Sequence, residues 1–118
     1  MTAYTAAIAK SATPTAATAD TVTLTGAGGA NAIQIINRDA TNALSVRVNF
    51  GTSNAPPTTA NTPVPTALGD DCFVVVGGTG PASVLTIKPI NGMPNTVVVG
   101  LFPNAVTPPY TVQAVWTL

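Results

Sequence analysis

Short runs in which apolar and polar residues alternate are the feature that most limits how this chain can fold. The run at the C-terminus is the clearest, because Tyr110, Val112, Ala114, Trp116 and Leu118 occupy every second position. Successive side chains of a β-strand point to opposite faces, so this spacing places these residues on one face. It predicts a strand with one buried face, to which Trp116 contributes a large core side chain.

Six further segments have the character of strands and are separated by turns that contain Gly, Pro or Asn. Residues 44–50 place four apolar side chains on one face and Ser45, Arg47 and Asn49 on the other. Short strands at this spacing predict an all-β fold, an antiparallel β-sandwich of Ig-like or jelly-roll type. The short turn at 39–42 predicts that the strands on either side of it pair as a β-hairpin. The seven predicted strands are residues 21–25, 32–38, 44–50, 71–76, 83–88, 96–101 and 110–118.

The segment at 1–19 differs from the rest of the chain, because it consists mainly of Ala and Thr and is interrupted by Pro14. A chain of 118 residues suits one domain. We therefore expect an extended N-terminal arm at 1–19 followed by a β-sandwich domain at 20–118. Two interpretations of the arm stay open, a disordered tail or a segment that orders against a neighbouring subunit. Since it lacks a basic start and carries Lys10, we expect no signal peptide.

The residue types that most enzymes need are nearly absent. The chain has no His, one Cys and only 7% charged residues. Acid–base catalysis and nucleophile activation depend most often on His, and transition-metal sites draw on His and Cys clusters. We therefore expect no enzyme activity, no catalytic residues, no cofactor and no metal site.

Nucleic acids and membranes are not expected partners either. Phosphate binding requires clustered basic residues, whereas Lys10, Arg38, Arg47 and Lys88 are scattered singly along the chain. A membrane-spanning helix requires about 20 apolar residues, and the apolar runs here are much shorter.

The outward positions of the predicted strands carry mostly Thr, Ser, Asn and Gln, and the formal net charge is zero. Soluble monomers normally use charged side chains to keep apart and to protect strand edges. Burying Thr or Ala costs much less desolvation free energy than burying Lys or Glu. The composition therefore predicts a surface that neighbouring subunits cover.

Several stretches carry a resemblance to a known class of proteins. They are VTLT at 22–25, IINRD at 35–39, LSVRV at 44–48, GDDCFVVV at 69–76 and YTVQ at 110–113. In pattern they resemble small structural proteins of tailed bacteriophages, namely capsid decoration (cement) proteins and short tail proteins with β-sandwich folds. The resemblance covers roughly residues 20–115. It implies a homo-oligomer, with a trimer favoured, that is made in the host cytoplasm and bound on the capsid surface of the virion.

The leading hypothesis is a non-enzymatic virion structural protein, most simply a decoration or cement protein. Its partners would be the major capsid protein or other virion proteins, and it would stabilise the phage head by bridging capsomers. One alternative is a tail-tube, tail-tip or fibre subunit. Another is a carbohydrate-binding or adhesin β-sandwich module, in which Phe102 and Tyr110 are the best candidates for stacking on a sugar.

Two proline-rich loops and the arm are the expected contact surfaces. Four prolines between 56 and 65 exclude a central strand, and loops of this length in small domains are usually functional. A second proline-containing loop spans 103–109. The candidate assembly contacts are Tyr4, Ile8, Pro56, Pro57, Pro63, Pro65, Phe102, Pro108 and Pro109.

The same composition predicts a folding stability that varies weakly with pH and salt. No His and few carboxylates are present to titrate between about pH 5 and 9, and few ion pairs are available for salt to screen. Urea unfolding across this pH range should give a nearly constant free energy of unfolding. A steep loss near pH 6 would contradict the prediction.

Overall fold

Eight β-strands and one short 3₁₀ helix make up the regular structure in a computed structural model of the chain. The structure describes residues 4–12, 20–52, 54–62, 73–78, 83–90, 92–103 and 109–117. The elements are β1 (Tyr4–Ala12), β2 (Asp20–Thr25), η1 (Ala27–Gly29), β3 (Ala32–Asn37), β4 (Leu44–Asn49), β5 (Phe73–Val75), β6 (Val84–Ile87), β7 (Thr96–Pro103) and β8 (Tyr110–Thr117).

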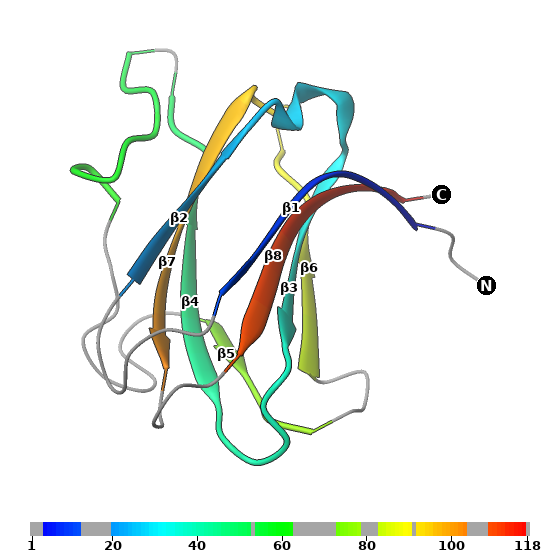
Figure 1. The fold of residues 1–118 in the computed structure, drawn as a ribbon. Coiled ribbons are helices and arrows are strands. Elements are labelled where there is room, and N and C mark those ends of the chain that lie inside the picture. Colours follow the sequence, from blue (N-terminus) through cyan, green and yellow to red (C-terminus); the bar gives the residue numbers. More distant parts are fainter. Residues whose placement is uncertain are drawn as a thin grey trace.

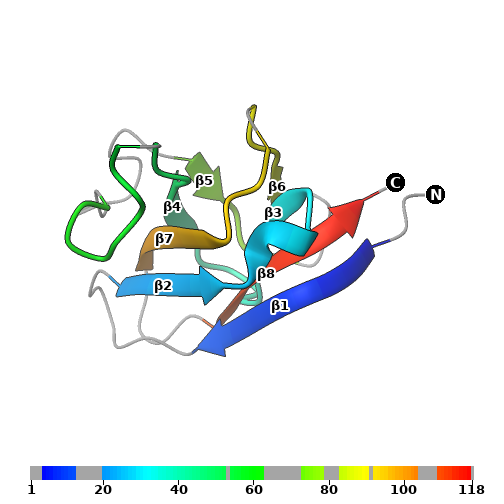
Figure 2. The same ribbon diagram turned by 90° about the horizontal axis from the view of Figure 1, so that it is seen from above.

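The strands form two antiparallel four-stranded sheets that pack face to face (Figures 1 and 2). Sheet A has the order β1-β8-β3-β6, and sheet B has the order β2-β7-β4-β5. The strands pair as in one long hairpin that is rolled into two layers: β1 with β8, β2 with β7, β3 with β6 and β4 with β5. This is the topology of a jelly roll. The predicted all-β sandwich is thus confirmed, and its type is the jelly roll.

All seven predicted strands are present, and the remaining strand, β1, lies within the predicted arm. The segment is extended as expected, but it pairs with β8, from Tyr4 opposite Thr117 to Ala12 opposite Tyr110. An Ala/Thr segment has no strong apolar alternation to reveal a strand. Its pairing partner, β8, comes from the other end of the chain. The rest of the predicted arm lies outside the described residues.

The predicted hairpin at 39–42 is wrong, because β3 lies in sheet A and β4 in sheet B. Side-chain hydrogen bonds redirect the chain here. The Asn37 Nδ2 donates to the carbonyl oxygens of Asn42 (2.8 Å) and Val75 (3.0 Å). The Asp39 carboxylate accepts from the backbone N–H groups of Thr41 (2.8 Å) and Asn42 (2.9 Å), and these bonds hold the pKa of Asp39 below its usual value. Together they carry the chain from one sheet to the other.

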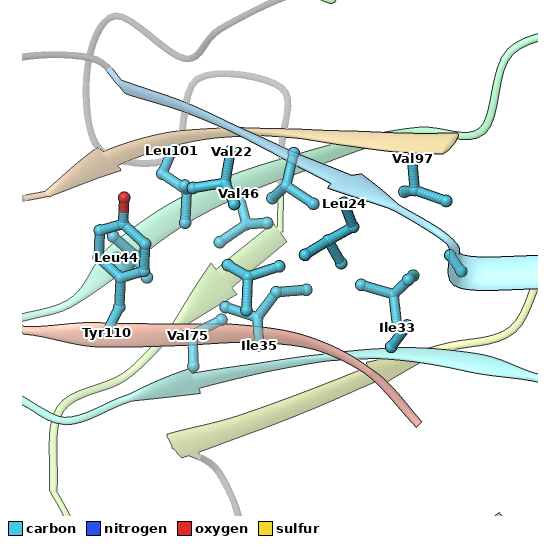
Figure 3. Close-up of a cluster of buried hydrophobic side chains, with 14 of the residues drawn as sticks. Val22, Leu24, Ile33, Ile35, Leu44, Val46, Val75, Val97, Leu101 and Tyr110 are labelled. Carbon is cyan, nitrogen blue, oxygen red and sulfur yellow. The ribbon is translucent and has the colours of Figure 1, made fainter. Parts of the chain in front are cut away.

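The core lies between the sheets and is built from the alternating apolar positions of β2, β3, β4, β7 and β8 (Figure 3). Each of these strands contributes every second residue, so period-two patterning sets which side chains are buried. Fully buried members include Leu24, Ile33, Ile35, Leu44, Val46, Val97, Val99, Leu101 and Val112.

Trp116 is a correction to the predicted core, because it is 50% exposed. The expected face of β8 is buried at Tyr110, Val112 and Ala114. However, β3 begins opposite Val115, so Trp116 lies beyond it and is flanked only by β1, opposite Thr5. The strand continues past the part of the sandwich that could cover the indole.

Tyr110 links the two sheets through a polar contact at one end of the core. Its ring is buried among the core side chains (Figure 3). Its hydroxyl donates a hydrogen bond of 2.8 Å to the carboxylate of Asp20, the first residue of β2. Burial first, and the neighbouring Asp20 carboxylate second, raise the pKa of Tyr110 well above its usual value.

Replacing Tyr110 with Phe removes this hydrogen bond, so we expect the free energy of unfolding at neutral pH to fall by about 1 kcal/mol. The raised pKa stabilises the wild type below the ordinary tyrosine value of about 10, and that contribution is lost as the pH rises further. Because Phe does not titrate, the difference between the two proteins should narrow above about pH 10. Urea unfolding of both proteins measures this. A difference that stays constant into the alkaline range would contradict it.

Candidate assembly surfaces

The outer face of sheet A carries no charged side chain at the described positions of β3, β6 and β8. Its central feature is a pair of neutral amides on adjacent strands, where the Gln113 Nε2 donates to the Gln34 Oε1. Gln34 and Thr111 are polar yet buried, since neighbouring strands satisfy and cover them. The face consists of Ala32, Gln34 and Ile36 on β3, Thr111, Gln113 and Val115 on β8, and Val84 and Thr86 on β6.

The outer face of sheet B is nearly as neutral. Thr21, Thr23 and Thr25 alternate along β2 with the core residues, and Arg47 in β4 is the single charge among the described outward positions. Val98 on β7 is fully buried, although it points away from the core, with Thr23 and Asn49 opposite it in register. The prediction of neutral outward positions is therefore confirmed for the described strands.

Most described charges lie at strand ends or in turns, where they stabilise local structure. Arg38 follows β3 and donates from Nε to the Thr111 Oγ1 at 2.7 Å. Asp39 holds the turn after β3, Asp20 binds Tyr110, and Lys88 follows β6. The Arg38 guanidinium thus lies at one end of the outer face of sheet A, beside Thr111, while the described positions of β3, β6 and β8 on this face are neutral. Asp70 and Asp71 lie outside the described residues.

The first proline-rich loop is held in one shape by neutral hydrogen bonds. The Asn49 Nδ2 donates to the Asn61 Oδ1 (3.0 Å) and to the Thr62 Oγ1 (3.2 Å). Asn61 also accepts from the Thr58 N–H (2.8 Å) and donates to the Pro56 carbonyl (2.9 Å). An irregular loop with this many internal bonds is preorganised, which lowers the entropy cost of binding.

A hollow of about 900 Å³ lies between this loop and the connection from β6 to β7. Phe50 and Met93 form its inner part and also pack against the core, whereas Ile90 stands at the rim and is 99% exposed. Among the described residues that line it, only Lys88 is charged. Such a preformed, mainly apolar hollow suits a neutral or apolar partner. The alternation in the sequence placed Phe50 among the four apolar side chains on one face of residues 44–50, and nothing in that pattern indicated a hollow.

The predicted contact residues do not form one surface. Pro56 and Pro57 are brought together at the hollow, Pro56 being exposed and Pro57 buried. Phe102 and Pro109 lie at the opposite end of the sandwich, because β4 and β7 are antiparallel and Phe102 is opposite Ser45. Both are half-buried, and the Pro109 carbonyl accepts from the Arg38 N–H at 2.9 Å.

The remaining predicted contacts are placed only in part. Tyr4 and Ile8 occupy β1, opposite Thr117 and Ala114 of β8. Pro63, Pro65 and Pro108 lie outside the described residues. The burial of Tyr110 in the core overturns its predicted role as a sugar-stacking residue.

Within the described part of the chain, no three His, Cys, Asp or Glu residues come together as a possible metal site. No helix there is long and apolar enough to cross a membrane. No family model, curated protein or solved structure matches this chain.

Gly51 determines the backbone conformation at the start of the proline-rich loop. Its φ is +70°, and a Cβ atom there would lie 2.5 Å from the Pro57 Cδ and 2.9 Å from the Ala55 carbonyl oxygen. We expect Gly51→Ala to cost about 1 to 3 kcal/mol and to displace the loop, because both the backbone and the close approach oppose a side chain. Urea unfolding and limited proteolysis measure the two effects.

Gly29→Ala is the matched control, because its Cβ would meet no atom within 4 Å and its φ lies outside the left-handed region. It should change stability by less than about 0.5 kcal/mol. Equal effects of the two substitutions would show that Gly51 does not determine the loop.

Proposed function

We propose that this chain is a non-enzymatic structural protein of a virion, a capsid decoration or cement protein that bridges capsomers on the phage head. The observation that carries the proposal is the neutral outer face that β3, β6 and β8 form in sheet A, with the Arg38 guanidinium only at one end of it. A partner that covers Gln34, Gln113 and Val115 displaces water from neutral groups, and the two amides already bond to each other within the sheet. The desolvation cost is therefore small compared with that of a charged face.

The preformed loop and hollow support the same role. A cement protein must hold a shell through many weak contacts, and surfaces that are ordered before binding lose little entropy when they dock. The hollow beside Pro56 and Pro57 offers an apolar contact at one end of the sandwich, while Phe102 and Pro109 lie at the other. Contacts at both ends suit a subunit that bridges two neighbours.

The topology is compatible with this function but does not select it. Jelly rolls occur in viral capsid proteins, in lectins and in cupins, and one fold can serve many functions. The proposed partners are the major capsid protein or other virion proteins, with the protein on the capsid surface as a homo-oligomer. A tail-tube, tail-tip or fibre subunit would need the same neutral faces and differs from the cement role in its location.

Purified particles from the source virus provide the test. We expect the chain in stoichiometric, symmetric amounts on the head, measured by quantitative mass spectrometry and by imaging of labelled particles. Label on the tail would favour the alternative, and absence from the particles would overturn the proposal.

A matched pair of variants tests the face itself by add-back to particles that lack the protein. Gln113→Lys introduces a charge on the outer face of sheet A, and we expect it to lower occupancy because a charge must be desolvated. Ala40→Lys adds the same charge at an exposed turn residue and should bind as the wild type does. Circular dichroism checks that both variants fold. Equal occupancy of the two would show that this face is not the contact.

A further inference from the structure

The core of the sandwich is incompletely covered at the end where β4 stops and β7 begins. Phe50, the residue after β4, and Met93, in the connection from β6 to β7, pack against the core but stay partly exposed. Both line the hollow of about 900 Å³ between the proline-rich loop and this connection, which lie at the same end of the molecule (Figure 1). An occupant of the hollow would cover these two side chains, which favours an apolar one.

Both walls of the hollow are held in place by hydrogen bonds within the chain. On the side of the proline-rich loop, the Thr52 N–H donates to the Ala55 carbonyl at 2.9 Å. On the other side, the Asn95 carbonyl accepts from the N–H groups of Gly26 (2.7 Å) and Ala27 (2.8 Å). The hollow is therefore formed before anything binds, and its lining loses little entropy when an occupant arrives.

The walls are poor in backbone donors, which limits how another chain could bind there. Four of the described lining residues are prolines and have no N–H group, namely Pro56, Pro57, Pro89 and Pro94. The Thr52 N–H is already bonded within its loop. An occupant therefore cannot add to these walls as a further strand and depends on contacts with side chains.

Lys88 is the one charged residue among the described residues that line the hollow, and it is exposed. No hydrogen bond or ion pair joins its side chain to the part of the chain that the structure describes. Arg38 and Asp39, in contrast, are bonded to Thr111 and to the turn after β3. An unpaired cation at an apolar hollow attracts an occupant that carries a negative charge, and such complementary charges help to select the partner.

Ile90 indicates that the occupant extends beyond the hollow. Its side chain stands at the rim and is 99% exposed, more than any other large apolar side chain of the described residues. A compact molecule inside the hollow would leave Ile90 in water. A chain segment that crosses the rim would cover Ile90 and reach Lys88 as well, and burying the isoleucine would strengthen the contact. A segment of another protein thus fits this site better than a small ligand.

We infer that the hollow receives a segment of a partner protein in which an apolar side chain adjoins an acidic one. The apolar side chain packs against Phe50 and Met93, the segment covers Ile90, and the carboxylate pairs with Lys88. Protein interfaces commonly combine an apolar anchor in a preformed pocket with polar contacts at the rim. The inference deepens the proposed assembly role and rests on it, because the partner is a neighbouring virion protein.

Substitutions at exposed positions test the charged and the apolar part of this contact separately. Lys88→Gln removes the charge and keeps a polar side chain. Ala40→Glu lowers the net charge equally at an exposed turn residue before β4, at the opposite end of the sandwich from the hollow. Ile90→Ser removes the apolar rim contact, and Ile90→Leu retains it. Each variant should fold because these three positions are exposed, and circular dichroism checks this.

Add-back to particles that lack the protein gives dissociation constants at low and at high salt. We expect Lys88→Gln to weaken binding about two- to fivefold at low salt, as for one exposed ion pair, and to match the wild type at high salt. Ile90→Ser should weaken binding about tenfold or more at both salt concentrations. Ile90→Leu and Ala40→Glu should bind as the wild type does.

Two fluorescent probes test the hollow in the free protein, without particles. Anilinonaphthalene sulfonate has an apolar body and a negative charge, and phenyl-naphthylamine has the same body without the charge. We expect the sulfonate to bind about two- to fivefold more tightly than the neutral probe. Lys88→Gln should abolish this difference and leave the affinity of the neutral probe unchanged, whereas Ala40→Glu should preserve the difference.

A sulfonate preference that survives Lys88→Gln, or a Lys88→Gln variant with wild-type affinity for particles at low salt, would overturn the inference. Probe binding as expected, combined with wild-type occupancy of all the variants on particles, would identify a small-molecule site and exclude the partner segment. If the chain is absent from particles but the probes behave as expected, the proposed function fails, and the preference of the hollow for apolar anions stands.

Discussion

Each sheet of this sandwich has one apolar face, and the rest of the structure depends on the two faces covering each other. Leu24, Val46 and Val99 of sheet B pack with Ile33 and Ile35 of sheet A, with side chains that alternate along every strand (Figure 3). The loops then only have to carry the chain between the layers. After β3 they do so through bonds of the Asn37 amide and the Asp39 carboxylate, while the Tyr110–Asp20 contact joins the two sheets at one end of the core.

The outward faces follow from the same alternation. Once the apolar residues of β3 and β8 point inward, the intervening positions must point outward, and here they are Gln, Thr, Ala, Ile and Val. A solvated sheet face would normally carry charge, so the neutral faces are a direct consequence of the composition. Such faces are suited to contact with other subunits, because burying neutral groups costs little desolvation free energy.

The strands themselves could be predicted because a period of two is a local property of the sequence. The alternation at 110–118 and at 44–50 identified strands and their inner faces before any partner was known. Pairing is not local, and this explains the errors. The turn at 39–42 is short enough for a hairpin, yet the strands on either side of it lie in different sheets. The sequence of β1 does not indicate a strand until its pairing with β8 is known. Trp116 is exposed because β3 begins opposite Val115, the residue before it. The hollow beside Pro56 likewise needs two loops that are far apart in sequence.

The sequence by itself determined the all-β class, the inward and outward faces of the strands and the scarcity of charge on the outward ones, because these depend only on residue type and spacing. The tertiary structure alone decided the jelly-roll order and the position of Pro56 and Pro57 beside the hollow. These features depend on which strands pair. The pairing must let the apolar faces of both sheets be buried against each other at the same time.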